Sequence, residues 1–209
     1  FVFLVPPPPP PPPQWQPPTM ALDRLRKELA DITKDTESGV TAFPIMENIQ
    51  HLKGSIKGPT DSPYDGGVFE VDIVIPDTYP FDPPKMRFTT KVWHPNVSSQ
   101  TGAICLDILK DNWSPALTVK TALVSLQALL SAPEPDDPQD AEVAAQYKGD
   151  NDSWAATAKF WTESYAMPKD LSAQVAQLQS MGFEKEAATK ALAEKGGDVE
   201  AAMEALLSG

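Results

Sequence analysis

Residues 94–109 read His94-Pro95-Asn96-Val97-Ser98-Ser99-Gln100-Thr101-Gly102-Ala103-Ile104-Cys105-Leu106-Asp107-Ile108-Leu109. They contain the only cysteine of a 209-residue chain, nine positions after an asparagine. A single cysteine flanked by isoleucine and leucine is most often a small buried hydrophobe. Here a proline-stiffened turn at residues 94–96 and a glycine turn at Gly102 bracket the thiol. That setting favours the alternative, a thiol positioned for covalent chemistry.

Four further segments extend this pattern on both sides of the cysteine. They read Pro63-Tyr64-Asp65-Gly66-Gly67, Tyr79-Pro80-Phe81-Asp82-Pro83-Pro84-Lys85, Trp113-Ser114-Pro115-Ala116 and Pro135-Asp136-Asp137-Pro138. Together with residues 94–109 they resemble the active-site region of ubiquitin-conjugating enzymes, in that family's order and spacing. The resemblance implies an α+β catalytic fold with an N-terminal helix, a four-stranded antiparallel meander and C-terminal helices. It also implies a cis bond before Pro80.

The charge distribution argues against nucleic acid as a partner. The chain carries a net charge of −12, and residues 131–170 hold nine acidic residues against three lysines. Phosphate backbones bind basic surfaces, so direct nucleic-acid binding is disfavoured. An acidic region after the cysteine is typical of a solubilising surface, and it also suits a basic or lysine-bearing partner.

Membrane insertion and disulfide bonding are both disfavoured. No apolar run approaches the roughly 20 residues that cross a bilayer. A lone cysteine cannot form an internal disulfide, which agrees with a reducing compartment. We therefore expect a soluble protein of the cytoplasm and nucleus.

Residues 1–19 form a proline-rich extension that we expect to be disordered. Five apolar residues precede eight consecutive prolines, and ten of the chain's 23 prolines fall in this segment. Such a run favours a polyproline II rod. The segment reads as translated upstream sequence or a truncated extension, and a ligand for proline-binding modules is the alternative. The apolar run is too short for a signal-peptide core.

Periodicity predicts the elements of a catalytic domain over residues 20–166. The spacing of an amphipathic helix is found at Leu22, Leu25, Leu29 and Ile32. Runs of β-branched and aromatic residues bounded by turns indicate strands near residues 40–46, 51–57, 68–75 and 86–89. Thr118 can cap a helix that extends to residue 131, and further helices are predicted over residues 141–147 and 154–165.

The C-terminal part of the chain predicts a separate helical domain over residues 171–209. After a short linker at residues 167–170, three helical patterns span residues 171–180, 184–194 and 198–207. Their order resembles a ubiquitin-associated domain, and the alternative is a plain helical extension. The resemblance implies a small apolar patch that binds ubiquitin noncovalently, formed by Met181, Gly182, Phe183, Leu206 and Leu207.

The resemblance to ubiquitin-conjugating enzymes implies a role for each polar residue near the thiol. Cys105 would carry ubiquitin as a thioester and pass it to a lysine amine. Asn96 would stabilise the oxyanion or hold the active-site loop, and Asp137 would orient the attacking lysine. Asp107 and Tyr79 are secondary candidates. We expect no cofactor and no metal, because the ATP is used by the upstream activating enzyme.

Three interpretations at the site remain open. Asp137 could belong to a simple turn before Pro138 that starts a helix. The segment between Asn96 and Cys105 is one residue longer than in many relatives, a variation of the subgroup with a ubiquitin-associated tail, so the reach of Asn96 is open. His94 could act as a base for the thiol, although the proline that follows it favours a framework role.

Partner surfaces also follow from the resemblance. The activating enzyme and ubiquitin ligases of the RING or HECT type would bind the first helix and two loops, through Phe81, Ser114, Pro115, Ala116, Arg24 and Lys27. Asp23 stands where many relatives have a basic residue. Affinity would therefore depend on the two cations of this helix.

These features predict a ubiquitin-conjugating enzyme that uses its tail to build degradation-type polyubiquitin chains. One rival interpretation is a noncatalytic ubiquitin-binding adaptor with the same fold, against which Cys105, Asn96 and Asp137 all argue. A second is an enzyme for another ubiquitin-like modifier, against which the tail domain argues.

Overall fold

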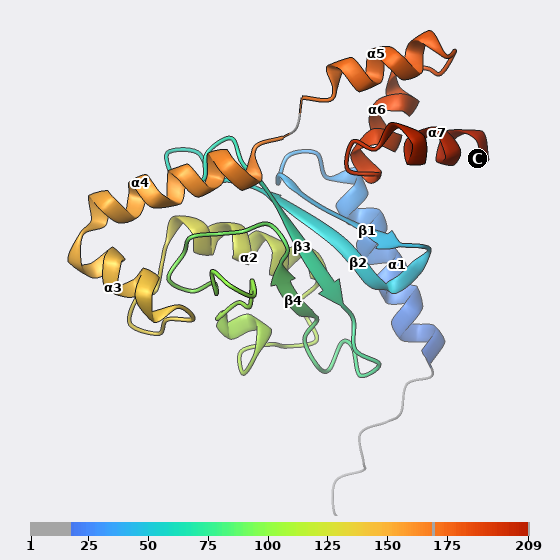
Figure 1. Ribbon diagram of the computed structural model, residues 1–209. Coiled ribbons are helices and arrows are strands. Elements are labelled where there is room, and N and C mark those ends of the chain that lie inside the picture. The colour runs from blue at the N-terminus through green and yellow to red at the C-terminus, as the bar shows by residue number, and fades with distance from the viewer. Residues whose placement is uncertain (1–17, 169, 209) are drawn as a thin grey trace, which may run out of the picture. The chain divides into compact units, whose positions relative to one another are not determined.

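The structure is a computed structural model that describes residues 18–168 and 170–208 (Figure 1). The chain divides into two compact units, of which the first ends at Ala166 and the second begins at Met167. Most of the proline-rich segment predicted to be disordered lies outside the described residues. Its last two residues, Pro18 and Thr19, belong instead to the first helix. Proline is favourable in a first helical turn, where its missing N–H would have no intrahelical partner.

The first unit is built on an antiparallel sheet in the order β1-β2-β3-β4 (Figure 1). Its strands are β1 (Val40–Ile45), β2 (Asn48–Lys57), β3 (Val68–Val74) and β4 (Lys85–Phe88). Side chains alternate between the two faces, because successive residues of a strand point in opposite directions. The register pairs Ile56 with Phe69 on the buried face and Ser55 with Glu70 on the other. The predicted four-stranded meander is thereby confirmed.

The first unit also contains four α-helices. They are α1 (Pro18–Lys34), α2 (Val119–Ser131), α3 (Ala141–Gly149) and α4 (Asn151–Trp161), the last continued by a π-helical turn over Thr162–Ala166. Thr118 caps α2 as predicted, since its side chain accepts a hydrogen bond from the N–H of Thr121. Helices α1 and α2 both contact β1 and β2. The hydrophobic core formed by the sheet and these two helices includes Leu25, Leu29, Ile32, Leu52, Ile56, Phe69, Val71, Ile73, Leu123, Leu126 and Leu130.

The second unit is a three-helix bundle with a core of its own. It consists of α5 (Ser172–Ser180), α6 (Lys185–Glu194) and α7 (Val199–Ser208). The buried side chains are Val175, Leu178, Ala188, Ala191, Leu192 and Ala202. Gly182 follows α5 with a φ of 98°, a conformation that glycine adopts at little cost. The Phe183 N–H then closes back on the Leu178 carbonyl at 3.2 Å. The predicted bundle is confirmed.

No helix in the described ranges combines the length and the apolar character needed to cross a membrane.

Gly102 shapes the turn that leads into the cysteine segment. Its φ is 73°, and a Cβ at this position would lie 1.9 Å from the Phe88 carbonyl oxygen. The close approach lets the Gly102 carbonyl accept the Phe88 N–H at 2.9 Å, which attaches the turn to the end of β4. The turn therefore tolerates no side chain at this position.

We predict that Gly102→Ala lowers the free energy of unfolding by at least about 2 kcal/mol, because it adds left-handed strain to a backbone clash. The matched control is Gly149→Ala at the end of α3, where a Cβ would meet nothing within 4 Å. Thermal and urea denaturation of both variants give the measurement. Equal stability of the two variants would contradict this account of the turn.

Candidate active site

Cys105 lies at the end of a tight loop that doubles back on itself. The loop is closed by the Ser98 N–H on the Ala103 carbonyl at 2.8 Å and by the Cys105 N–H on the Asn96 carbonyl at 2.9 Å. The cysteine is free and partly exposed, whereas its neighbour Ile104 is buried. The loop thus anchors itself through its apolar residues and leaves the sulfur accessible to solvent.

The side chain of Asn96 connects this loop to the acidic segment that follows α2. Its amide nitrogen donates to the carbonyl oxygens of Glu134 and Asp137, both at 2.9 Å, and its oxygen accepts the Glu134 N–H at 2.8 Å. Both amide hydrogens and the oxygen are therefore engaged, and the residue is only 1% exposed. Of the two roles predicted for Asn96, this geometry favours holding the loop.

Two further contacts attach the acidic segment to the cysteine loop. The Pro95 carbonyl accepts the N–H groups of Gln139 at 2.9 Å and Asp140 at 3.0 Å. The Asp140 carboxylate accepts the backbone N–H of Ser99 at 3.0 Å and its hydroxyl at 2.7 Å. Burial works against the charge of Asp140, but the hydrogen bonds from Ser99 and from the backbone of Val143 and Glu142 together prevail and lower its pKa. Ser99 and Asp140 were missed by the sequence analysis, because they lie 41 residues apart.

The cysteine sulfur lies between two opposite charges. Its thiol points to the Asp137 carboxylate at an Sγ–Oδ2 distance of 3.5 Å. The Lys110 ammonium approaches the same sulfur at an Nζ–Sγ distance of 3.2 Å. This hydrogen bond and the charge on the sulfur raise the pKa of Lys110. The structure thus brings together Cys105, Asn96 and Asp137 as predicted, and it adds Lys110, which the sequence analysis did not single out.

Asp107 is near the thiol in sequence, but its carboxylate is used within its own turn. One oxygen accepts the Ile108 N–H at 2.7 Å, and the other accepts the Asn112 side-chain amide at 2.7 Å. The backbone carbonyl of Asp107 also accepts the Lys110 N–H at 2.9 Å. Asp107 therefore shapes the turn from Asp107 to Asn112 and does not aim its carboxylate at the sulfur.

His94 is part of the framework, as its sequence context indicates. The side chain is fully buried, with Nδ1 accepting the Asn96 N–H at 3.0 Å and Nε2 lying 3.0 Å from the Leu129 carbonyl oxygen. This pairing requires the neutral ring with the proton on Nε2. Burial lowers the pKa of His94 to about 4. The histidine therefore joins α2 to the cysteine loop and is not a base for the thiol.

A buried carboxylate organises the region around α1. Glu28 is 7% exposed, and its oxygens accept hydrogen bonds from the Tyr79 hydroxyl at 2.7 and 2.9 Å and from the Val119 N–H at 3.0 Å. Burial first, and then the hydrogen bond to Glu28, raise the pKa of Tyr79. The hydroxyl of Tyr79 thus attaches the loop of residues 79–84 to α1. This role differs from the one near the thiol that was predicted for Tyr79.

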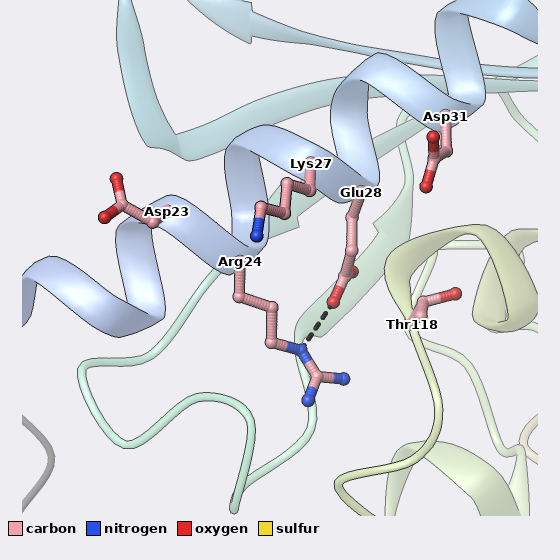
Figure 2. Close-up of a pocket in the computed structure, with 6 residues that line it drawn as sticks. All are labelled: Asp23, Arg24, Lys27, Glu28, Asp31 and Thr118. Carbon is pink, nitrogen blue, oxygen red and sulfur yellow. Dashed lines mark hydrogen bonds and ion pairs between the residues drawn. The ribbon is translucent and has the colours of Figure 1, made fainter.

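The pocket beside α1 shows how the two predicted partner-binding cations differ (Figure 2). It has a volume of about 490 Å³ and is lined by Asp23, Arg24, Lys27, Glu28, Asp31 and Thr118. The Arg24 guanidinium bonds Glu28 at 2.8 Å and the Leu117 carbonyl at 2.8 Å, so it is committed to the protein itself. Lys27 is exposed and is the cation that this surface offers to a partner.

Two loops display the remaining residues of the predicted ligase surface. Phe81 is 56% exposed and follows a cis peptide bond between Tyr79 and Pro80, as expected. Ser114, Pro115 and Ala116 are also exposed. The indole of Trp113 joins the two loops by donating to the Pro80 carbonyl at 2.8 Å. The loops therefore present their exposed residues from a common support.

The predicted ubiquitin-binding patch of the second unit is only partly exposed. Met181 is 52% exposed and Leu207 72% exposed, whereas Phe183 and Leu206 pack partly against the bundle core. Exposed apolar side chains next to half-buried ones form a surface that can dock a small apolar partner. Met181 and Leu207 are its most accessible members.

Among the described residues, no cluster of three or more histidine, cysteine or acidic side chains could hold a metal ion.

An α+β fold with a partly exposed cysteine beside an acidic loop is the arrangement of an enzyme that transfers acyl groups through a cysteine thioester. Comparison with known proteins gives the family. The family model described as "Ubiquitin-conjugating enzyme" matches residues 24–162, and that described as "UBA/TS-N domain" matches residues 171–206. The chain belongs to the ubiquitin-conjugating enzyme family, and it carries a ubiquitin-associated domain.

Individual relatives agree with this assignment. The chain is 54% identical to ubiquitin-conjugating enzyme E2 27 of Arabidopsis thaliana over 88% of this chain and 97% of that protein. It is 48% identical to ubiquitin-conjugating enzyme E2 K of Homo sapiens over 90% of this chain and 98% of that protein. The structure of a ubiquitin conjugating enzyme E2 domain from Toxoplasma gondii matches with a TM-score of 0.67 and 56% identity, covering 69% of this chain and 98% of that one.

The buried histidine predicts a specific pH dependence of stability. Its pKa is about 4 in the folded protein, and an unfolded chain has an ordinary histidine pKa of about 6.5. The unfolded state therefore binds more protons between these values, and the contribution of His94 to the free energy of unfolding falls by on the order of 3 kcal/mol as the pH drops from about 6.5 to about 4.

We predict that His94→Gln flattens this part of the curve, while His51→Gln, at the other of the two histidines, keeps it. Urea unfolding across this pH range gives the measurement. An unchanged slope in His94→Gln would show that the buried ring is not the titrating group.

Proposed function

We propose that Cys105 accepts ubiquitin as a thioester from the activating enzyme and passes it to a lysine amine. The observation that carries this proposal is the accessible sulfur with the Asp137 carboxylate 3.5 Å away, on a loop held by Asn96. In loading, a new bond forms between Sγ and the ubiquitin carbonyl carbon, and the carbon–sulfur bond to the activating enzyme breaks. The thiolate of the activating enzyme leaves and takes up the proton that the Cys105 thiol has lost. This chemistry requires no cofactor.

Asp137 serves the second half of the reaction. A lysine that attacks the thioester carbon must approach next to the sulfur, where the Asp137 carboxylate lies. A carboxylate alone favours a protonated amine, so it acts by orienting the lysine and relaying its proton as the carbon–nitrogen bond forms. The Cys105 sulfur then leaves as a thiolate and regains a proton. Asn96 acts through the position of this loop.

The partner surfaces follow from the exposed residues. We infer that the activating enzyme and ligases of the RING or HECT type bind Lys27 together with Phe81 and Ser114, Pro115 and Ala116, because these side chains are free to contact a partner. An aromatic side chain on a rigid loop is a good anchor for such an interface. Arg24 supports this surface through its bond to the Leu117 carbonyl.

We further propose that the tail domain holds ubiquitin while chains are extended. A single patch of this size binds weakly, but tethering to the catalytic unit raises the effective concentration of the bound ubiquitin. Chains that mark proteins for proteasomal degradation in the cytoplasm and nucleus are the product we expect. The acidic surface of the chain, with its net charge of −12, is consistent with lysine-bearing substrates.

Incubation with activating enzyme, ATP and ubiquitin tests the catalytic assignment. We predict an adduct of the wild-type protein that thiol reductants cleave and that is lost in Cys105→Ala. The matched control is Ser98→Ala in the same loop, which leaves the sulfur in place. A wild-type protein that forms no adduct while still binding ubiquitin would favour a noncatalytic ubiquitin-binding adaptor. Loading with a different ubiquitin-like protein would favour an enzyme for that modifier.

The tail patch is tested by substituting only its exposed members. We predict that Met181→Ala combined with Leu207→Ala weakens ubiquitin binding by about tenfold and shortens chains, while loading of Cys105 is unchanged. Lys190→Ala on the exposed side of α6 is the control. Titration by NMR and gel analysis of chain length provide the readouts. Unchanged chains with weakened binding would remove the tail from the mechanism.

A further inference from the structure

The thiol must lose its proton to attack a thioester, and the nearest carboxylate opposes this step. Asp137 lies 3.5 Å from the sulfur, so its negative charge disfavours a thiolate. The ammonium of Lys110 lies closer, at 3.2 Å, and has the opposite sign. Given that Cys105 is the acyl carrier proposed above, we propose that Lys110 is a catalytic residue of loading, whose ammonium stabilises the Cys105 thiolate against the charge of Asp137.

The position of Lys110 results from the turn that Asp107 organises. The lysine follows the short helix Asp107–Leu109, and its N–H bonds the Asp107 carbonyl at 2.9 Å. The Asp107 carboxylate fixes both sides of this turn through Ile108 and Asn112. The lysine lies five positions after the cysteine, and the turn folds the chain between them so that the ammonium reaches the sulfur. Asp107 is therefore a positioning residue for Lys110.

The surrounding charges show which groups compete for the ammonium. Asp137, on the acidic segment, and Asp111, next to Lys110 in the turn, both favour its charged form. The hydrogen bond to the Cys105 sulfur is the largest contribution to its raised pKa. An ammonium that remains charged at neutral pH is the state needed to stabilise a thiolate. The lysine is exposed, so solvent screens its effect.

The two charged residues act on different atoms of the reaction. Before loading, the sulfur can become negative, and the ammonium of Lys110 is its counter-charge. After loading, the sulfur carries the acyl group and no charge, until aminolysis releases it again as a thiolate beside the Lys110 ammonium. Asp137 then faces the incoming lysine amine. Lys110 thus stabilises negative charge on the sulfur, first when the thioester forms, and Asp137 orients the amine that attacks it.

Alkylation of Cys105 by iodoacetamide measures this effect without ubiquitin. The thiolate sulfur bonds the reagent's carbon and iodide leaves, so the rate reports the fraction of thiolate. We predict that Lys110→Gln reacts about threefold more slowly than the wild type near neutral pH and low salt, the size expected for an exposed charge pair. The difference in rate should vanish at strongly alkaline pH, where Cys105 is ionised in the wild type and in the variant alike. It should also shrink with added salt.

Two variants separate charge from shape. Lys110→Arg keeps the cation and should alkylate within about a factor of two of the wild type. Lys85→Gln removes an equal charge from the exposed side of β4 and should react like the wild type. Equal rates for wild type and Lys110→Gln at every pH would overturn the proposal, and so would an equal loss in Lys110→Arg.

Loading assays separate this proposal from the one on which it rests. A wild-type protein that forms no reducible adduct with ubiquitin would refute Cys105 as the acyl carrier, whatever the alkylation rates. A wild type that loads normally, with Lys110→Gln loading at the same initial rate, would refute the role of Lys110 alone. We expect Lys110→Gln to load about threefold more slowly at low salt and Lys110→Arg to load normally.

Discussion

The carboxamide of Asn96 is the interaction on which the active site depends. It makes three hydrogen bonds to Glu134 and Asp137 from a position that is 1% exposed. Without it, three backbone groups would lose their partners, and each buried unsatisfied group costs about 1–3 kcal/mol. Because the Asn96 carbonyl also accepts the Cys105 N–H, one residue sets the distance between the thiol and the acidic segment. The charge pattern around the sulfur therefore rests on a neutral side chain.

A second buried polar group plays the same part for the partner-binding surface. Glu28 joins α1 to the Tyr79 hydroxyl and to the start of α2, and Arg24 extends this connection to the Leu117 carbonyl. Buried polar networks that are fully satisfied rigidify the elements they join. The loops that carry Phe81 and Pro115 are thus attached to α1 through hydrogen bonds of Glu28 and Arg24. Lys27 is exposed and can contact a partner. Each functional region is thus organised by the hydrogen bonds of one buried side chain, Asn96 in the first and Glu28 in the second.

The sequence predicts the fold well because the relevant patterns are local. One helix is predicted from the spacing of Leu25, Leu29 and Ile32, and another from the cap at Thr118. Each pattern lies within a single helix. The site is predicted in part, since the cysteine motif points to Cys105 and Asp137 but does not show where side chains are directed. Asn96 reaches a carbonyl 38 residues away, and Lys110 reaches the sulfur only through the turn at Asp107. Those contacts depend on tertiary folding, which periodicity and motif spacing do not contain.

The most direct test of this account is a double-mutant cycle on discharge of the loaded enzyme to free lysine. If Asn96 acts by holding the Asp137 segment, Asn96→Ala and Asp137→Ala each slow discharge by about tenfold or more, and the double variant is no slower than the slower single variant. Rates that multiply in the double variant would contradict the account, because they would give Asn96 a contribution of its own at the reacting carbon.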